Sequence, residues 1–207
     1  GTGKTSFLGN FLRRDDYYLN NFKGDDVYIF SPLKNDFKME TIIKVKDIPE
    51  GNITSNFDDE ILGFVYDKMV EEFEDDITHG RFPPHKLIIL DDLSFSGKLR
   101  GSNFNNISRV FCNGRKQNIS IIITSQFYTH ILPVCRENAS FIVLYNTSHK
   151  QLESCAEENN YLPNKKMFID MFRANVTERN DFLMINHSNK YENLYLNKDF
   201  EPLQPDI

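Results

Sequence analysis

The sequence predicts an α/β protein in which a mainly parallel central sheet is flanked by helices. Short apolar runs typical of buried strands alternate with amphipathic stretches of helical periodicity. A glycine-rich segment, Gly1–Thr5, leads directly into the first helical stretch. One apolar run, Leu87–Leu90, ends in two carboxylates, Asp91 and Asp92. In sheets of this kind ligands bind at the carboxyl ends of the strands, so both acids stand where a site is expected.

Residues Gly1–Thr5 match the end of a phosphate-binding loop, G-x-x-x-x-G-K-[ST]. Backbone N–H groups of such a loop surround the phosphates, and the next helix points its positive end at the same anion. The Lys4 ammonium would reach the β- and γ-phosphates, and the Thr5 hydroxyl would bind Mg²⁺. The motif also predicts another glycine and a strand ahead of Gly1; a glycine-rich segment with no ligand is the alternative. The expected nucleotide-binding residues are Gly1, Thr2, Gly3, Lys4, Thr5 and Ser6.

The first half of the chain supplies elements on either side of a sheet. Residues 4–14 have helical spacing and end in two arginines, which suits a helix C-terminus. Val27–Phe30 is a short buried strand, and Thr41–Val45 is a possible second one. Residues 58–74 form an amphipathic helix with acidic residues at its N-terminus.

The acids after Leu90 are typical of a strand that carries catalytic metal chemistry in phosphate-loop enzymes. Asp91 would hold the Mg²⁺ shell directly or through water, and Asp92 would polarise the attacking water. The alternative is a strand followed by an ordinary acidic turn. Residues 94–103 form a glycine-containing loop with Lys98 and Arg100, either a DNA-backbone contact or a plain surface loop.

A second strand of the expected site ends in a polar residue. Residues 105–113 are helical and stop at Gly114, Arg115 follows, and Ile119–Ile123 is a buried strand. Gln126 lies just beyond that strand, where it would sense the γ-phosphate. A simple strand cap is the other interpretation of this glutamine.

The C-terminal part adds strands that need not be parallel. Residues 141–145 form a further strand, and Thr147 is the expected cap of the helix that follows. Pro163 opens another helix. Two apolar runs, 182–185 and 193–196, flank a turn and predict an antiparallel hairpin.

Length and composition predict one domain over residues 1–200 and a short tail over 201–207. The mean hydropathy of −0.48 and the lack of a long apolar run predict no membrane span. No signal peptide is visible. Three scattered cysteines predict reduced thiols rather than a metal site. The net charge of −6 means that a nucleic-acid partner would need a local basic patch.

The order of these motifs resembles that of viral DNA-packaging ATPases of the FtsK/HerA superfamily, found in poxviruses, other large nucleocytoplasmic DNA viruses and virophages. Segment 114–126 carries the resemblance, together with Leu90–Leu93 and Arg136–Ala139. It covers about residues 1–200. Lys116 stands where the family commonly has histidine.

The resemblance implies a RecA-like domain with added antiparallel strands that works in a homo-oligomeric ring. Such a motor would hydrolyse ATP with Mg²⁺ and drive double-stranded DNA into a preformed capsid. Its partner on the capsid would be a vertex protein. It would act at the viral assembly site in the host cytoplasm, or in the virion. Asp92 would replace the more widespread catalytic glutamate, and Gln126 would couple hydrolysis to movement. Either Arg115 or Arg136 would reach across the subunit interface.

Other functions share part of this pattern. Another phosphate-loop translocase, a helicase or a secretion ATPase would use the same ATP chemistry on different cargo. A small-molecule kinase fits the paired acids and Gln126 less well. A GTPase is disfavoured because no N-K-x-D sequence is present. A non-catalytic module that uses nucleotide only to stabilise an assembly would not need Lys4, Asp91, Asp92 and Gln126 intact.

Overall fold

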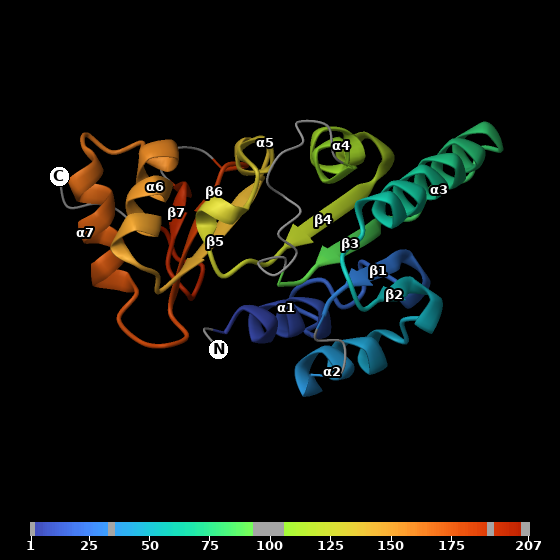
Figure 1. Cartoon of the computed structure of the whole chain (residues 1–207), viewed down its shortest axis with the longest axis horizontal. Helices are drawn as coiled ribbons and strands as arrows, with labels where there is room; N and C mark the ends of the chain where they lie inside the picture. Colours follow the sequence, from blue (N-terminus) through green and yellow to red (C-terminus); the bar gives the residue numbers. More distant parts are fainter. Residues whose placement is uncertain (1–2, 33–35, 93–105, 190–192, 204–207) are drawn as a thin grey trace. The chain divides into compact units, whose positions relative to one another are not determined.

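The structure is a computed structural model that describes residues 3–32, 36–92, 106–189 and 193–203. The chain divides into two compact units. The N-terminal unit is Thr5–Gln126, and the C-terminal unit is Phe127–Ile207 together with Gly1–Lys4. Figure 1 follows the elements of each unit in chain order. No helix among the described residues has both the length and the apolar composition of a membrane span.

The N-terminal unit is built on a four-stranded parallel sheet in the order β2-β1-β3-β4. Its central strands are almost continuously apolar, as buried parallel strands are. The prediction of a mainly parallel sheet is therefore confirmed. The strands are β1 Val27–Phe30, β2 Ile53–Thr54, β3 Lys86–Leu90 and β4 Ile119–Ile123.

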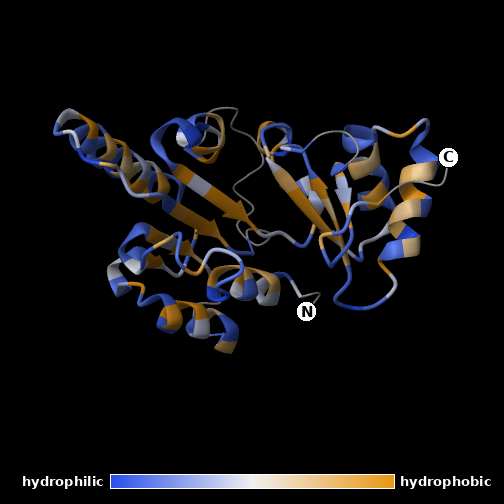
Figure 2. Cartoon of the chain, turned by 180° about the vertical axis from the view of Figure 1, so that it is seen from behind, coloured by the Kyte–Doolittle hydropathy of each residue, from blue (hydrophilic) through white to orange (hydrophobic). Residues whose placement is uncertain are grey.

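Helices cover both faces of this sheet (Figure 1), and Figure 2 shows the apolar strands between them. Alternate residues of β1 and β3, such as Ile29 and Ile89, pack in one core with Leu8 of α1 and Met39 of α2. The intervening residues point to the other face, on the side of α3 and α4. The helices are α1 Lys4–Arg13, α2 Phe37–Lys46, α3 Asp59–Thr78 and α4 Asn106–Asn113, with 3₁₀ turns at Gly24–Asp26, Glu50–Asn52 and Gly114–Gln117.

Helix α1 runs against the strand direction. At its far end, the N–H of Tyr18 donates to the carbonyl of Phe11, and the Tyr18 ring stacks 6.0 Å from the Phe22 ring. The Phe22 ring in turn lies 5.1 Å from the ring of His85, which immediately precedes β3. The end of α1 is therefore at the amino edge of the sheet, and its first turn lies toward the carboxyl edge.

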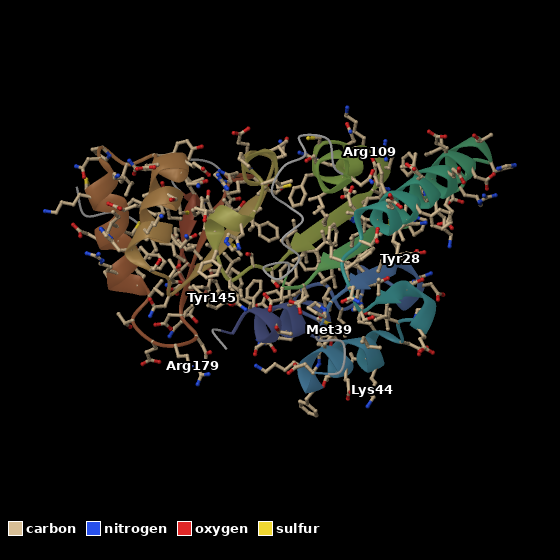
Figure 3. All side chains as sticks on the ribbon, in the orientation of Figure 1. Tyr28, Met39, Lys44, Arg109, Tyr145 and Arg179 are labelled. Atoms are coloured by element: carbon tan, nitrogen blue, oxygen red, sulfur yellow. The ribbon has the colours of Figure 1, made fainter. Side chains whose placement is uncertain are left out.

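The prediction of a strand at Thr41–Val45 was wrong, because this segment belongs to α2. Asp36 caps that helix by accepting a hydrogen bond from the N–H of Lys38 at 3.0 Å. Met39, Ile42 and Lys46 are buried at helical spacing. Figure 3 shows Met39 and Lys44 on α2; Met39 is buried against the sheet and Lys44 is exposed. The short strand β2 lies later, at Ile53–Thr54, where none was expected.

The C-terminal unit contains a three-stranded antiparallel sheet in the order β5-β6-β7, which confirms the added antiparallel strands and the hairpin. Its core includes Phe168, Leu183 and Tyr195. The elements are a 3₁₀ turn at Tyr128–His130, α5 Pro133–Glu137, β5 Phe141–Tyr145, α6 His149–Asn159, α7 Lys165–Asn175, β6 Phe182–Asn186 and β7 Tyr195–Leu196.

Two helix starts in this unit differ from the expectation. Ser148, not Thr147, is the N-cap residue of α6. Helix α7 begins at Lys165 rather than at Pro163, because the Asn164 side chain accepts a hydrogen bond from the N–H of Met167 at 3.0 Å. In the tail, Pro202 forms an isolated bridge with Leu196.

Replacing Gly24 by alanine is expected to destabilise the N-terminal unit. A Cβ atom at this position would lie against the backbone carbonyl oxygens of Lys46 and Asp47, well inside van der Waals contact. The chain leading into β1 must then shift away from the end of α2. We expect Gly24→Ala to lower the free energy of unfolding by about 1–3 kcal/mol, measured by chemical denaturation.

Gly51→Ala is the matched control. Among the described residues, nothing lies within 4 Å of a Cβ atom built at Gly51. We expect this variant to stay within about 0.5 kcal/mol of the wild type. Equal effects of the two substitutions would contradict the close packing of Gly24.

Candidate functional site

The register of three parallel strands places three polar residues side by side. Phe30, Leu90 and Ile123 are paired across β1, β3 and β4. Beyond these pairs, the N–H of Asp91 donates to the Phe30 carbonyl at 2.8 Å, and the N–H of Thr124 donates to the Leu90 carbonyl at 2.9 Å. The next residue of each strand, namely Ser31, Asp91 and Thr124, therefore stands at the same level on the carboxyl edge.

The carboxylate of Asp91 is held by two hydroxyl groups. Ser31 Oγ donates to Asp91 Oδ2 at 3.1 Å, and Thr124 Oγ1 donates to Oδ1 at 2.6 Å. Asp91 is only 2% exposed. By strand alternation it shares the face of Ile29 and Ile89, which α1 and α2 cover. The predicted metal residue is thus buried under the helix that begins with the predicted phosphate-binding residues.

This environment fits a cation. No ion pair to Asp91 occurs within the part of the chain that the structure describes. Burying a carboxylate without a positive partner is costly, so a bound cation would offset a real penalty. The described residues also contain no group of three or more typical metal ligands. Mg²⁺ is commonly held in this way, by one or two carboxylates, water and substrate phosphates.

Asp92 has a constrained backbone next to that carboxylate. Its φ of 50° lies in the left-handed region, which is uncommon for a residue other than glycine. Its N–H donates to Thr124 Oγ1 at 2.9 Å. Its carboxylate accepts from Gln126 Nε2 at 3.2 and 3.3 Å. The structure therefore brings together the two side chains that the sequence assigned to water activation and phosphate sensing.

The start of α1 has the features of an anion site. Gly3 has a φ of 100°, a conformation that favours glycine. Lys4, Thr5 and Ser6 form the first turn, whose N–H groups have no partner inside the helix. Lys38 Nζ donates to Ser6 Oγ at 2.7 Å, which brings a second ammonium group to this turn. Gly1 and Thr2 lie outside the described residues, as do Lys98 and Arg100.

Arg115 is exposed and stands at the opposite edge of the sheet from the carboxylates. It belongs to the 3₁₀ turn Gly114–Gln117, directly before β4 begins at Ile119. The five residues of β4, at about 3.3 Å each, separate it from the carboxyl edge by roughly 16 Å. Arg115 therefore cannot reach Asp91 or Asp92 of its own chain.

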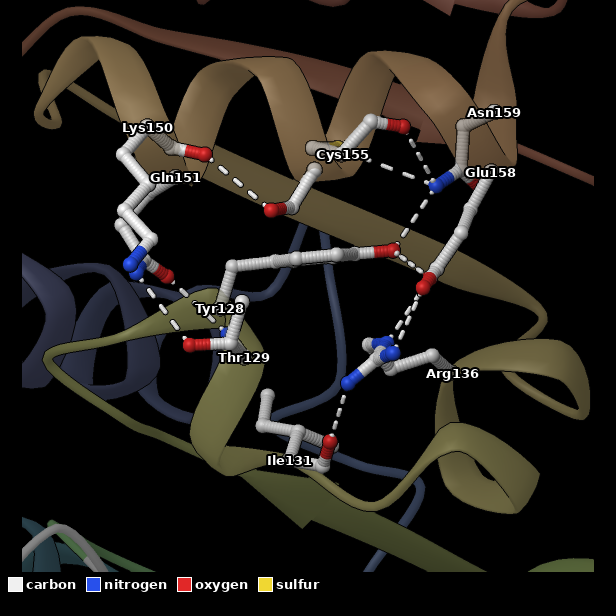
Figure 4. A network of polar contacts seen from close by, with 10 residues as sticks. Tyr128, Thr129, Ile131, Arg136, Lys150, Gln151, Cys155, Glu158 and Asn159 are labelled. Atoms are coloured by element: carbon white, nitrogen blue, oxygen red, sulfur yellow. Dashed lines mark hydrogen bonds and ion pairs between the residues drawn. The ribbon is translucent and has the colours of Figure 1, made fainter.

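Arg136 is committed to a network inside the C-terminal unit (Figure 4). Its side chain is 11% exposed. The guanidinium donates to both carboxylate oxygens of Glu158, at 2.8 and 2.5 Å, and to the Ile131 carbonyl at 2.5 Å. It also lies 4.9 Å above the centre of the Tyr128 ring. These contacts fix α5 to α6 through one side chain.

Tyr128 extends the same network. Its hydroxyl donates to Glu158 Oε2 at 2.6 Å and accepts from Asn159 Nδ2 at 2.9 Å. Burial, reinforced by the hydrogen bond to Glu158, raises the pKa of the Tyr128 phenol. Burial alone would raise the pKa of Glu158, but the hydrogen bonds from Arg136 and Tyr128 and the guanidinium charge together lower it. Tyr128 is thereby anchored to α6 two residues after Gln126.

Sequence reasoning did not find Ser31, Thr124 or Lys38. Ser31 and Thr124 each follow an apolar strand directly, as Asp91 does. This shared position was the available signal, but its meaning depends on the strand register. Lys38 offered no signal, since its helix was not expected.

Comparison with known proteins gives one family and one fold. The profile of a family described as Poxvirus A32 protein matches residues 1–198. A search of curated proteins finds no match. The genome packaging NTPase B204 from Sulfolobus turreted icosahedral virus 2, in complex with AMP, has a TM-score of 0.65 at 10% identity, over 98% of this chain and 93% of that chain. Its complex with ATP-gammaS has a TM-score of 0.62 at 11% identity, with the same coverage. The chain therefore shares the fold of B204, which confirms the expected fold class.

The substitution Arg136→Gln is expected to destabilise the protein, whereas Arg115→Gln is not. Loss of the Arg136 guanidinium leaves Glu158 and the Ile131 carbonyl without a charged donor. We expect a loss of about 1–3 kcal/mol in the free energy of unfolding. The exposed Arg115 serves as the matched control and should change it by less than about 0.5 kcal/mol. Equal losses would show that Arg136 does not hold α5 to α6.

The effect of Arg136→Gln should also depend on pH. Because the folded-state pKa of Glu158 is lowered, the stability from this pair is fully present above the ordinary pKa of glutamate. It is lost as the pH falls through the lowered folded-state value. The difference in Tm between wild type and variant should therefore be largest near neutral pH and shrink below about pH 4. A difference that grows on acidification would contradict this assignment.

Proposed function

The chain belongs to the poxvirus A32 protein family, and we propose that it is an ATP-hydrolysing motor that moves double-stranded DNA into a preformed viral capsid. One observation carries the proposal. The buried Asp91 and the constrained Asp92 stand together at the carboxyl edge of a parallel sheet, on the side where α1 begins with Lys4 and Thr5. The likeness to the fold of a viral genome packaging NTPase supports it.

The nucleotide would be bound by the start of α1. The N–H groups of the first turn and the Lys4 ammonium would hold the phosphates. Thr5 and Asp91 would hold Mg²⁺, which when bound neutralises phosphate charge and orients the transferred group. Lys38, through its contact with Ser6, brings a further positive charge to this end of the helix.

Hydrolysis would be assisted by Asp92. Its carboxylate would orient the attacking water and accept its proton. Gln126, hydrogen-bonded to that carboxylate, would respond to loss of the γ-phosphate. Since the C-terminal unit begins at Phe127 and Tyr128 is anchored to α6, a change at Gln126 would pass directly to that unit. Gln126 would thereby couple hydrolysis to movement.

Arg115 would act on the site of a neighbouring subunit in a homo-oligomeric ring. Its side chain is exposed and stands at the far edge of the sheet from the acids of its own chain. Arg136 is instead occupied by Glu158. An arginine supplied across an interface can raise the rate by about 10³–10⁵. The proposed partners are therefore a second copy of the chain, duplex DNA and a capsid vertex protein, at the viral assembly site in the host cytoplasm or in the virion.

ATP turnover by the full-length protein should increase with long double-stranded DNA and decrease with added salt, because phosphate contacts weaken as salt rises. Lys4→Ala should abolish turnover by removing phosphate binding. Asp92→Asn should lower kcat by about 10²–10⁴ while ATP binding persists. Phosphate release and binding of a fluorescent ATP analogue measure the two effects.

The other outcomes separate the competing functions. Turnover that is indifferent to DNA would indicate an ATPase with different cargo, such as a secretion ATPase. Nucleotide binding without turnover, unchanged by Asp92→Asn, would indicate a non-catalytic assembly module. Turnover that persists in Lys4→Ala would contradict the assignment of the phosphate-binding loop.

Mixing two inactive variants tests whether Arg115 acts in trans. Arg115→Gln and Asp92→Asn should each abolish turnover alone. In randomly mixed rings, roughly a quarter of the interfaces combine an intact Asp92 with an intact Arg115 from the neighbour, so turnover should return to a similar fraction. Lys4→Ala mixed with Asp92→Asn is the control, because both residues serve their own site in the proposed mechanism.

The control mixture contains no subunit in which Lys4 and Asp92 are both intact, so it should stay inactive. Recovery in the first mixture alone would support the trans role. Full activity of Arg115→Gln by itself would exclude Arg115 from the reaction.

A further inference from the structure

The hydroxyl of Thr124 joins the two acids of the site. It donates to Asp91 Oδ1 at 2.6 Å and accepts from the N–H of Asp92 at 2.9 Å. A hydroxyl group has a single hydrogen, so with the Asp92 N–H on its oxygen that hydrogen is directed to Asp91. Thr124 is 9% exposed, and its own N–H is bound to the Leu90 carbonyl. The position of this hydroxyl is therefore set by the sheet.

The contact to Asp92 matters because the Asp92 backbone is not in a preferred conformation. A φ of 50° is unfavourable for a residue with a Cβ and persists only when surrounding contacts hold it. Thr124 holds the amide end of Asp92, and Gln126 holds its carboxylate. Without the hydroxyl, the backbone of Asp92 would lose the contact that fixes where its side chain points.

We propose that Thr124 is a positioning residue that fixes the distance and direction of Asp92 relative to Asp91 through its one hydroxyl group. The inference rests on the proposed function, in which Asp91 holds the metal and Asp92 orients the attacking water. In this role Thr124 acts through Asp91 and Asp92 rather than on the nucleotide or the water. It sets the relative position and orientation of the proposed metal ligand Asp91 and the proposed water-orienting residue Asp92.

Ser31 provides an internal comparison. Its hydroxyl donates to Asp91 at 3.1 Å from the other side, and no hydrogen bond from it to Asp92 is present among the described residues. Removing it disturbs the metal carboxylate and leaves the hydrogen bond between the Asp92 amide and Thr124 in place. Removing the Thr124 hydroxyl disturbs both acids.

The test uses the full-length protein with three variants. Thr124→Val keeps the shape and loses the hydroxyl, Thr124→Ser keeps the hydroxyl, and Ser31→Ala loses the other donor to Asp91. Four quantities are measured: kcat for ATP, KM for ATP, the Mg²⁺ concentration at half-maximal rate, and hydrogen exchange at the Asp92 amide without nucleotide. Circular dichroism and thermal melting confirm that each variant is folded.

Thr124→Val should lower kcat by about 10² with KM for ATP within a few-fold of wild type, because misplacing a reacting group costs rate rather than binding. It should also speed exchange at the Asp92 amide, which loses its acceptor. Thr124→Ser should restore kcat and the slow exchange. Ser31→Ala should raise the Mg²⁺ requirement and leave the Asp92 exchange unchanged.

Two results would overturn the proposal. One is a folded Thr124→Val protein whose Asp92 amide exchanges as slowly as in the wild type. The other is faster exchange with unchanged kcat. Should Thr124→Val not fold, Thr124→Ala, which also lacks the hydroxyl, takes its place, and Asp92 exchange as slow as in the wild type would again overturn the proposal. A wild type without turnover would reject the proposed function, and the exchange measurements would still decide whether Thr124 fixes the Asp92 backbone.

Discussion

The parallel register of β1, β3 and β4 is the constraint on which the site depends. Because Phe30, Leu90 and Ile123 are paired, the three residues that follow them meet at one level without any loop to arrange them. The apolar residues beneath are fully buried in β1 and β3, so a slip by one residue would turn Asp91 to the other face and bury a carboxylate away from its hydroxyl donors. The core that stabilises the sheet thereby also determines the geometry of the acids.

Among the described residues, Asp91 is surrounded by hydroxyl groups rather than by arginine or lysine, and this arrangement suits a metal ligand. A permanent cation would neutralise the carboxylate and leave nothing for a metal to offset. Two hydroxyls from Ser31 and Thr124 satisfy part of its hydrogen-bonding capacity and leave its charge uncompensated. If Asp91 binds Mg²⁺ as proposed, a carboxylate in this environment would gain more from the ion than one that is already paired. Arg115 fits this account, because the length of β4 separates it from the carboxyl edge on which Asp91 stands.

Local sequence patterns predicted most of the helices and strands. The residues that they did not identify depend on contacts between segments that are distant in the sequence. The apolar runs of β1, β3, β4 and β5 and the helical spacing of α1 and α3 are visible in sequence because each is a local pattern of apolar residues. β1 and β3 are buried throughout, whereas β4 and β5, for which a buried strand was also expected, are only partly buried among the described residues. The short apolar run at residues 41–45 resembles a strand, but the cap by Asp36 begins a helix that includes it. Ser31 and Thr124 could not be found, because a hydroxyl after a strand has meaning only once the register is known. The partner of Arg136, Glu158, lies 22 residues away and is likewise set by tertiary packing. The strand expected ahead of Gly1 stays a prediction; within the described residues β4 pairs on one side only, with β3.

The segment after β4 connects the acids at the carboxyl edge to the C-terminal unit within a few residues of the chain. Gln126 is the last residue of the N-terminal unit and holds the Asp92 carboxylate. Tyr128, two residues on, is bound to Glu158 and Asn159 of α6. A flexible connection would absorb a shift of Gln126, whereas an anchored one would transmit it. If Gln126 acts as proposed, the Arg136–Glu158 pair would support that role by holding fixed the segment that follows Gln126.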